Sequence, residues 1–223
     1  MSPSPDRTPQ ADEPPIRRAA SAICAREGAA GEPEVLLVRR SLQSRFLPGY
    51  VAFPGGAVDE ADDAHAERWF ADSAQAYRAA AVRELAEEVG LYLTADGLRA
   101  GSLADVDDRP PAPEQLCDLC HWIAPPDVPV RFDARYFTVQ APGGLEPVPD
   151  GHETIEAWWA SPRALLLGWE EGARKLYWPT WYTVTQLATC ASAAQLAAFT
   201  FETRDPTPEE EATLPRHVME NEP

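Results

Sequence analysis

The chain has 223 residues, enough for one domain with a sizeable core, and 44% of them are hydrophobic, as in ordinary globular proteins. Asp and Glu number 36 against 19 Lys and Arg, which gives a formal net charge of −17. This acidity argues against a nucleic-acid binder, because a polyphosphate backbone needs a basic footprint. It still allows a small phosphorylated ligand, which a divalent cation and a few arginines can hold.

No apolar run is long enough to span a membrane, so we expect no membrane partner. The N-terminus is polar and rich in proline, without the apolar core of a signal peptide, and we therefore expect a cytoplasmic protein. A disulfide framework is a poor explanation for cysteines in that compartment. Cys117, Cys120 and His121 match the letters of a C-x-x-C-H motif, but no second cysteine pair has the spacing of a zinc site. We interpret these residues as structural or coincidental.

Composition divides the chain into three regions. Residues 1–15 are rich in proline and small polar residues and are predicted to be disordered. Residues 16–203 are predicted to form one folded domain, in which we find no internal repeat. Residues 204–223 are acidic and are predicted to be a solvated tail.

The first half of the domain contains short apolar runs bounded by turn residues, which predict strands. These runs are Arg18–Cys24, Glu34–Arg39 and Tyr50–Phe53. An alanine-rich segment with scattered charges predicts a helix at Asp62–Tyr77. The strongest helix prediction is Ala79–Val89, because it is rich in good helix formers and Gly90 is a suitable C-terminal cap.

The second half of the domain continues to interleave strands, loops and helices. Strands are predicted at Cys120–Ala124, Arg131–Gln140 and Glu156–Ala160, and proline-rich loops at 104–113 and 142–151. Ser161 before Pro162 predicts the start of a helix over Arg163–Leu167, and an alanine-rich stretch predicts a long last helix at Pro179–Phe199. The elements lack regular βαβ spacing, so we predict an α/β class with a mixed β-sheet sandwiched between helices.

Three carboxylates share one face of the predicted Ala79–Val89 helix. Glu84, Glu87 and Glu88 lie at positions i, i+3 and i+4, so their like charges are close together. A hard divalent cation such as Mg²⁺ relieves such repulsion and prefers oxygen ligands. Arg83 lies beside the cluster, where it can orient a carboxylate or bind a phosphate. The alternative, an acidic stripe that faces water, stays open on these residues alone.

The opposite face of the same helix carries Ala80, Ala81, Leu85 and Val89, small and apolar residues suited to packing on a sheet. Upstream, Phe53-Pro54-Gly55-Gly56 lets the backbone approach a ligand or a metal, since neither glycine carries a Cβ. A turn of this kind followed by an acidic segment and R-E-L-x-E-E-x-G-L resembles the box of the Nudix hydrolases, G-x5-E-x7-R-E-U-x-E-E-x-G-U.

The resemblance assigns most positions of the box directly. Gly56 is its opening glycine, and Arg83 to Leu91 match the helical part without a mismatch. Asp62 stands where the first glutamate belongs, but the seven-residue gap has grown to twenty residues, so 61–78 is an insertion. Because of this insertion, three neighbouring acids are alternatives to Asp62. They are Asp59, Glu60 and Asp63.

The resemblance implies a Nudix fold and hydrolysis of a phosphoanhydride bond. Mg²⁺, or Mn²⁺, would be held by Gly56, Glu84, Glu87 and Glu88, and Arg83, Glu84 and Glu87 would take part in catalysis. In this family a further acid outside the box often acts as a base or a ligand. Asp150, Glu153 and Glu156 are the candidates, of which we select Glu153.

The segment 36–56 resembles the signature of the coenzyme A diphosphatases, including the peroxisomal branch and its bacterial relatives, with Val38 in place of the usual threonine. This favours coenzyme A or acyl-coenzyme A as substrate, with Arg40, Arg45 and Gly55 in contact with it. Two alternatives stay open: hydrolysis of ADP-ribose, NAD(H) or a nucleoside triphosphate, and a non-catalytic nucleotide sensor. A surplus of late aromatic residues is compatible with a homodimer.

Overall fold

The computed structural model of the chain describes residues 15–101, 103–126 and 130–214. Almost all of the segment predicted to be disordered, 1–15, lies outside these residues, as does the end of the 204–223 tail. Within the tail, the described part contains a short helix, α7 (Pro208–Thr213), whose first turn is capped by Thr207. Leu214, just after α7, is buried, so this part of the tail packs on the domain.

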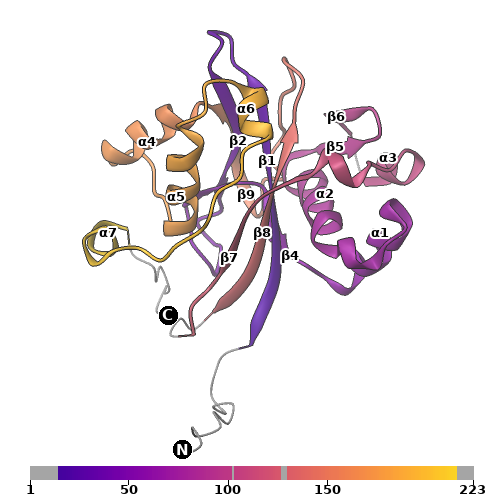
Figure 1. Cartoon of the computed structure of the whole chain (residues 1–223), viewed down its shortest axis with the longest axis horizontal. Helices are drawn as coiled ribbons and strands as arrows, with labels where there is room; N and C mark the ends of the chain where they lie inside the picture. The colour runs from indigo at the N-terminus through magenta and orange to yellow at the C-terminus, as the bar shows by residue number, and fades with distance from the viewer. Residues whose placement is uncertain (1–14, 102, 127–129, 215–223) are drawn as a thin grey trace, which may run out of the picture.

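A mixed sheet of seven strands forms the centre of the domain (Figure 1). Its strands are β1 (Ile16–Glu27), β2 (Pro33–Arg40), β3 (Val51–Ala52), β4 (Gly55–Ala57), β7 (Cys117–Ile123), β8 (Arg131–Gln140) and β9 (Thr154–Ala160). β1 and β8 run parallel, whereas the other strand pairings of the sheet are antiparallel. Because β8 occupies one edge of β1, β4 and β2 must share the other edge, where β4 pairs with residues 19–21 and β2 with residues 25–27.

Helices cover both faces of the sheet (Figure 1). On one face lie α1 (Glu60–Phe70), α2 (Ala76–Val89) and α3 (Leu103–Asp108), together with the hairpin of β5 (Leu91–Thr94) and β6 (Gly97–Ala100). On the other face lie α4 (Pro162–Glu170), α5 (Trp178–Leu187) and α6 (Ala193–Ala197). The predicted α/β architecture, a mixed sheet between helices, is confirmed.

Strand alternation divides the core into two halves. In β1, Ala22 and Cys24 pack with the α2 side of the sheet, whereas Ile23 and Ala25 pack with the α5 side. All four are fully buried. A strand that is buried on both faces reads as a continuous apolar run, which explains why this part of β1 was predictable without an alternating pattern.

Helix α2 confirms the predicted two-sided helix. Ala80, Ala81, Leu85 and Val89 are fully buried against the sheet. Gly90 ends the helix with a left-handed φ of 64°, and its N–H donates to carbonyls of the last turn.

The insertion does not form the single helix predicted over Asp62–Tyr77. Helix α1 ends at Phe70 because Ala71 adopts a left-handed conformation with φ 54°. Asp72 then accepts a hydrogen bond from the N–H of Ala74 and caps a short 3-10 turn, Ser73–Gln75, that leads into α2. Two short helices therefore replace one long helix.

Three other predictions are corrected. Part of the predicted loop 104–113 is helical as α3, and the predicted helix Pro179–Phe199 divides into α5 and α6, the second capped by Ser192. The β5–β6 hairpin was missed, because four-residue strands are too short for their periodicity to be recognised. The strand at Arg131–Gln140 and the helix capped by Ser161 are confirmed.

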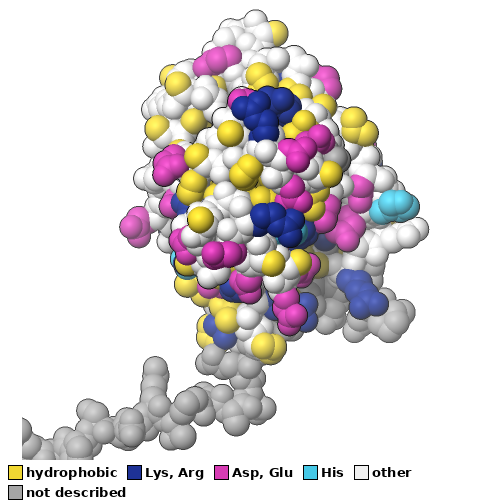
Figure 2. All heavy atoms as spheres, turned by 90° about the vertical axis from the view of Figure 1, so that its right-hand side faces the viewer, with side chains coloured by type: hydrophobic (Ala, Val, Ile, Leu, Met, Phe, Trp, Pro, Cys, Tyr) yellow, Lys and Arg dark blue, Asp and Glu magenta, His cyan; other side chains and the backbone are white. Residues whose placement is uncertain are grey.

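Acidic side chains are spread over the face that carries α1 and α2 and are interspersed with a few Lys and Arg (Figure 2). In residues 15–101, 103–126 and 130–214, no helix combines the length and the apolar character needed to cross a bilayer.

Candidate active site

Helix α2 presents its carboxylates to the turn between β3 and β4. Glu84 and Glu88 are buried, at 8% and 4% exposure, whereas the side chain of Glu87 is half exposed. Gly56 lies directly against Glu84, and a methyl group on Gly56 would overlap that carboxylate. The N–H of Gly55 donates to Glu88 Oε2 at 3.0 Å. The two glycines and the two buried acids therefore form one compact group, as the sequence predicted.

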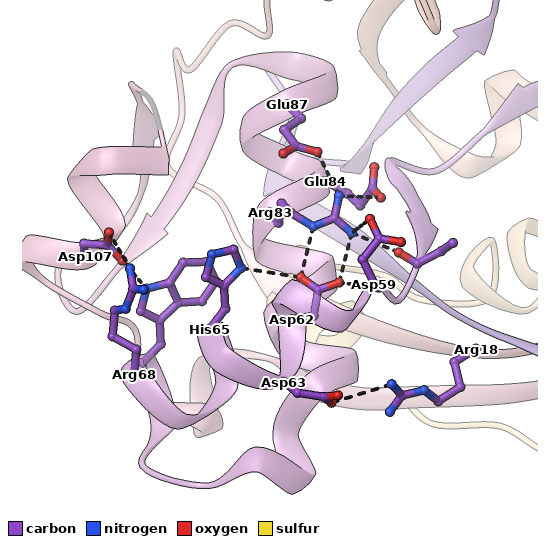
Figure 3. Close-up of polar contacts among 12 residues, drawn as sticks. Arg18, Asp59, Asp62, Asp63, His65, Arg68, Arg83, Glu84, Glu87 and Asp107 are labelled. Carbon is purple, nitrogen blue, oxygen red and sulfur yellow. Dashed lines mark hydrogen bonds and ion pairs between the residues drawn. The ribbon is translucent and has the colours of Figure 1, made fainter.

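Arg83 connects carboxylates of α1 and α2 beside this group (Figure 3). Its Nε and Nη2 donate to the two oxygens of Asp62, each at 3.0 Å. Its Nη1 donates to Glu84 at 2.9 Å and to Glu87 at 2.8 Å, and Nη2 also donates to the carbonyl of Ala57 at 2.9 Å. A planar guanidinium thus fixes the positions of three carboxylates.

The position of the first acid of the box, left open by the sequence, is occupied by Asp62. Asp62 is fully buried and pairs with Arg83 through both of its oxygens. Asp59 lies 4.0 Å from Arg83 and its side chain is 69% exposed, whereas Asp63 points away and pairs with Arg18 (Figure 3). Asp62 also accepts the N–H of Asp59, so one carboxylate caps α1 and binds Arg83 at the same time.

The rest of α1 anchors Asp62. The His65 ring stacks on Trp69 with centroids 4.5 Å apart, and its Nδ1 lies 3.6 Å from Asp62 (Figure 3). Trp69 Nε1 donates to Asp107 of α3 at 2.8 Å, and Arg68 pairs with the other oxygen of the same carboxylate. Contacts with α3 therefore fix the C-terminal part of α1, and the first turn of α1 supplies Asp62 as the partner of Arg83.

Burial sets the protonation of the two inner acids. It raises the pKa of Glu84 to about 7, although the charge of Arg83 opposes the shift, and it raises the pKa of Glu88 to about 8. Burial would lower the pKa of Arg83, but its hydrogen bonds to Asp62 and the charge of Glu84 raise that pKa above its usual value.

These observations fit the predicted metal. Oxygen donors from Glu84, Glu88 and the backbone of Gly56 form the hard set that Mg²⁺ or Mn²⁺ prefers, and a cation would relieve the charge that burial penalises. Within residues 15–101, 103–126 and 130–214, no three His, Cys, Asp or Glu side chains are already gathered at coordinating distances. Glu87 in particular is turned toward Arg83.

A tight turn after the loop 142–151 brings two further acids to the site. Asp150 accepts the N–H groups of His152, Glu153 and Thr154, and its own N–H donates to the carbonyl of Glu88. Burial opposes ionisation of Asp150, but these hydrogen bonds lower its pKa overall. Glu153 faces the site closely enough for its charge to raise the pKa of both Glu84 and Glu88.

Glu156, the third candidate outside the box, has a different place. It lies on β9, where it pairs with Arg39 and Arg174, and it does not line the cavity. Asp150 and Glu153 both do. The structure therefore leaves these two as the candidates for an acid outside the box.

A cavity of about 630 Å³ begins at these carboxylates and continues over the sheet. At its acidic end it is lined by Gly55, Gly56, Arg83 and the three glutamates of α2. Arg40 lines it as predicted, and its Nε donates to the carbonyl of Phe46 at 3.0 Å. Arg45, in contrast, is exposed and is not among the residues that line the cavity.

Strands β1 and β8 line the cavity with residues that the sequence analysis missed. These are Arg17, Ala19 and Ser21 of β1 and Phe132 and Ala134 of β8. Ala19 and Ser21 lie beside β4, whereas Arg17 and its register partner Phe132 lie beyond β4, at the far end of the cavity. Their alternation along each strand is a usable signal, but it places them at the cavity only once the β1–β8 register is known.

The four cysteines are free, as predicted. Cys117 and Cys120 lie on β7, and a register irregularity between them interrupts the ladder with β8. His121 pairs with Asp133 across the same two strands at 2.6 Å. These contacts give the C-x-x-C-H letters a structural role in the β7–β8 pairing.

The fold and the site together define a class: an α/β protein in which two glycines and a helix that carries carboxylates meet beside a cavity. The family model of the NUDIX domain matches residues 15–178, more than half of the chain. The chain belongs to the Nudix family.

Similar proteins agree with this assignment. An uncharacterized Nudix hydrolase named NudL from Shigella flexneri is 33% identical over 123 residues, which are 55% of this chain and 56% of that protein. The chain spans about half the length of the curated relatives it matches. The crystal structure of a NUDIX hydrolase from Alicyclobacillus acidocaldarius is 29% identical, with a TM-score of 0.71 over 84% of this chain and 98% of that one. A Caenorhabditis elegans Ap4A hydrolase shares the fold, with a TM-score of 0.50 and 19% identity over 82% of this chain and 100% of that one.

Proposed function

We propose that this chain is a hydrolase of phosphoanhydride bonds that depends on Mg²⁺ or Mn²⁺. The observation that carries the proposal is the group at the acidic end of the cavity: Glu84 and Glu88, both buried, beside the backbone of Gly55 and Gly56. Two buried carboxylates beside a ligand-sized cavity are suited to bind a cation, and a cation there would meet the phosphates of a ligand.

The residues of the site have separable tasks in this proposal. Gly56, Glu84, Glu88 and, once released from Arg83, Glu87 would hold the metal, which supplies charge neutralisation at the diphosphate oxygens. Arg83 orients Glu84 and Glu87. Glu153 would accept the proton of the attacking water; its position on the cavity wall and the hydrogen bond from its N–H to Asp150 support this role.

The favoured substrate is coenzyme A or acyl-coenzyme A, cleaved to 3′,5′-adenosine diphosphate and (acyl)phosphopantetheine. The segment around Arg40 supports this proposal through its signature, and Arg40 and Gly55 line the cavity. ADP-ribose, NAD(H) and nucleoside triphosphates are the alternative substrates within the family.

Product analysis tests the substrate. Purified protein with Mg²⁺ is incubated with coenzyme A and with each alternative, and the products are identified by mass spectrometry. The proposal expects 3′,5′-adenosine diphosphate and phosphopantetheine. Good turnover of another diphosphate without turnover of coenzyme A would exclude coenzyme A as the substrate.

A non-catalytic sensor is the alternative of another class. Hydrolysis assays of wild type and Glu87→Gln distinguish the sensor from an enzyme. If the protein is a hydrolase, wild type turns over substrate and the variant loses this activity by orders of magnitude, whereas a sensor shows no turnover in either form. Glu60→Gln, an exposed glutamate of α1 outside the cavity, is the matched control.

A further inference from the structure

Three arginines line the cavity, and they differ in what they already contact. The guanidinium of Arg83 is engaged by carboxylates. Arg40 lies at the acidic end, where its charge opposes the rise in the pKa of Glu88. The side chain of Arg17 is exposed and has no hydrogen bond or ion pair with any residue in the described part of the chain. It is therefore a cation of the cavity wall that is available to a ligand.

Strand geometry aims Arg17 into the cavity. On β1 it shares a face with Ala19 and Ser21, and all three line the cavity. Its neighbour Arg18 faces the other side of the sheet, where it lies 3.6 Å from Asp63 and near the Tyr77 ring (Figure 3). Two adjacent arginines are thus divided by the strand into one that faces the cavity and one that does not.

The register of β1 fixes how far Arg17 lies from the acidic end. Ala20 pairs with Gly56, the glycine packed on Glu84. Arg17 precedes Ala20 by three residues, which is about 10 Å along a strand. A ligand whose anhydride lies beside Gly56 can therefore reach Arg17 with a group that is on the order of 10 Å away, and an acidic group there would pair with the guanidinium.

The wall between the two ends suits an uncharged linking group. Ala19 pairs with Ala134 across β1 and β8, and these small side chains leave space above the sheet. Phe46 and Phe132, with ring centroids 5.7 Å apart, form an apolar side to this space. A sugar and base can occupy such a space while acidic groups lie at both ends.

We propose that Arg17 binds a phosphomonoester of the substrate, remote from the bond that is hydrolysed, and so makes the enzyme selective for diphosphates that carry one. A guanidinium is suited to this dianion because it can donate two parallel hydrogen bonds. The inference rests on the proposed function and deepens it. Arg45, which the sequence analysis placed in contact with the substrate, lies outside the cavity.

The test compares substrates that differ only in this phosphate: coenzyme A against dephospho-coenzyme A, and NADP against NAD, all with Mg²⁺. Wild type, Arg17→Ala, Arg17→Lys and the matched control Arg18→Ala are assayed. Arg17→Ala should lose about tenfold in kcat/KM, through KM, for the phosphorylated member of each pair only. Arg17→Lys should keep part of the preference, and Arg18→Ala should behave as wild type.

Equal losses for both members of a pair in Arg17→Ala would overturn the proposal, as would a wild type without preference for the phosphorylated member.

If the enzyme hydrolyses only other diphosphates, the proposed substrate is wrong, and Arg17 is tested by measuring how nucleotides inhibit the hydrolysis of those diphosphates. If nothing is hydrolysed, binding is measured by calorimetry instead. In both cases 3′,5′-adenosine diphosphate should bind Arg17→Ala about tenfold more weakly than wild type, with AMP unchanged. Unchanged binding of both nucleotides overturns the proposal.

Discussion

The two ends of the cavity are built in different ways. The acidic end is formed mainly by two short segments, with Glu84, Glu87 and Glu88 on one helix and Gly55 and Gly56 at the start of β4. The far end, where Arg17 of β1 is the register partner of Phe132 of β8, is formed by two strands that are distant in the sequence. The acidic end is buried and its side chains hold one another, whereas Arg17 at the far end is exposed.

This difference separates chemistry from selectivity. A group that acts on a reacting bond must be held rigidly, and the contacts of Arg83 achieve this at the acidic end. A side chain that only selects a substrate can be exposed to solvent in the free protein, because its contact forms when the ligand binds. Substitutions at the acidic end should therefore change kcat, and substitutions at the far end should change KM.

The largest effect is expected for Glu84→Gln. This change preserves the shape of a buried side chain but removes the charge beside Gly56, so kcat should fall about 10³-fold. Steady-state kinetics with Mg²⁺ measure the fall, and thermal unfolding checks that the variant is folded. Activity within twofold of wild type would remove Glu84 from the metal site.

Asp62→Ala should have the next largest effect, on stability. It leaves the buried guanidinium of Arg83 without its bidentate partner, and such a loss costs about 3 kcal/mol in the free energy of unfolding. Asp63→Ala, one residue away, removes only an exposed pair with Arg18 and should cost less than about 1 kcal/mol. Urea unfolding compares the two, and equal costs would contradict the role given to Asp62.

Trp69→Phe tests how firmly the insertion is anchored. A smaller aromatic ring remains beside His65, but the hydrogen bond to Asp107 is lost, at a cost of about 1.5 kcal/mol for that bond alone. Arg68→Ala, which removes the exposed pair with the same carboxylate, should cost no more than about 0.5 kcal/mol. Urea unfolding at pH 7 distinguishes the two variants, and a larger cost for Arg68→Ala would reverse the assignment.

The smallest effect is a pH dependence of that anchor. The hydrogen bond from Trp69 lowers the pKa of Asp107 below its ordinary value of 3.8. A carboxyl group with a lowered pKa in the folded state stabilises the protein above its unfolded pKa, and this contribution is lost as the pH falls through the folded pKa. The stability difference between wild type and Trp69→Phe should therefore be full at pH 7 and shrink below pH 4. A difference that stays constant to pH 3 would contradict this linkage.

The sequence was sufficient for the acidic end because local rules determine it. Helical spacing puts Glu84 and Glu88 on one face and the apolar residues on the other, and Gly90 ends the helix. The first acid was harder to assign, because the insertion offers several carboxylates and only burial distinguishes Asp62 from Asp63. Burial depends on where α1 packs, and α1 is held by Asp107, a residue of an element that was predicted to be a loop.

The far end could not be predicted for a different reason. Arg17 and Arg18 look alike in sequence, and only the direction of the strand decides which of them faces the cavity. Arg45 was assigned to the substrate by its place in the segment that resembles the coenzyme A diphosphatase signature. A position in a signature does not fix where a side chain points, and Arg45 lies in a loop exposed to water.

The parallel pairing of β1 with β8 also has a consequence for the folding rate. It joins residues from opposite halves of the chain, from Ile16 with Arg131 to Ala25 with Gln140. Folding must close a long loop before this ladder gains any hydrogen bond, so domains with such topology fold slowly. During that delay the strand edge of β1 is unpaired and can associate with other chains. Refolding yield should therefore fall as protein concentration rises, although the folded domain covers this edge.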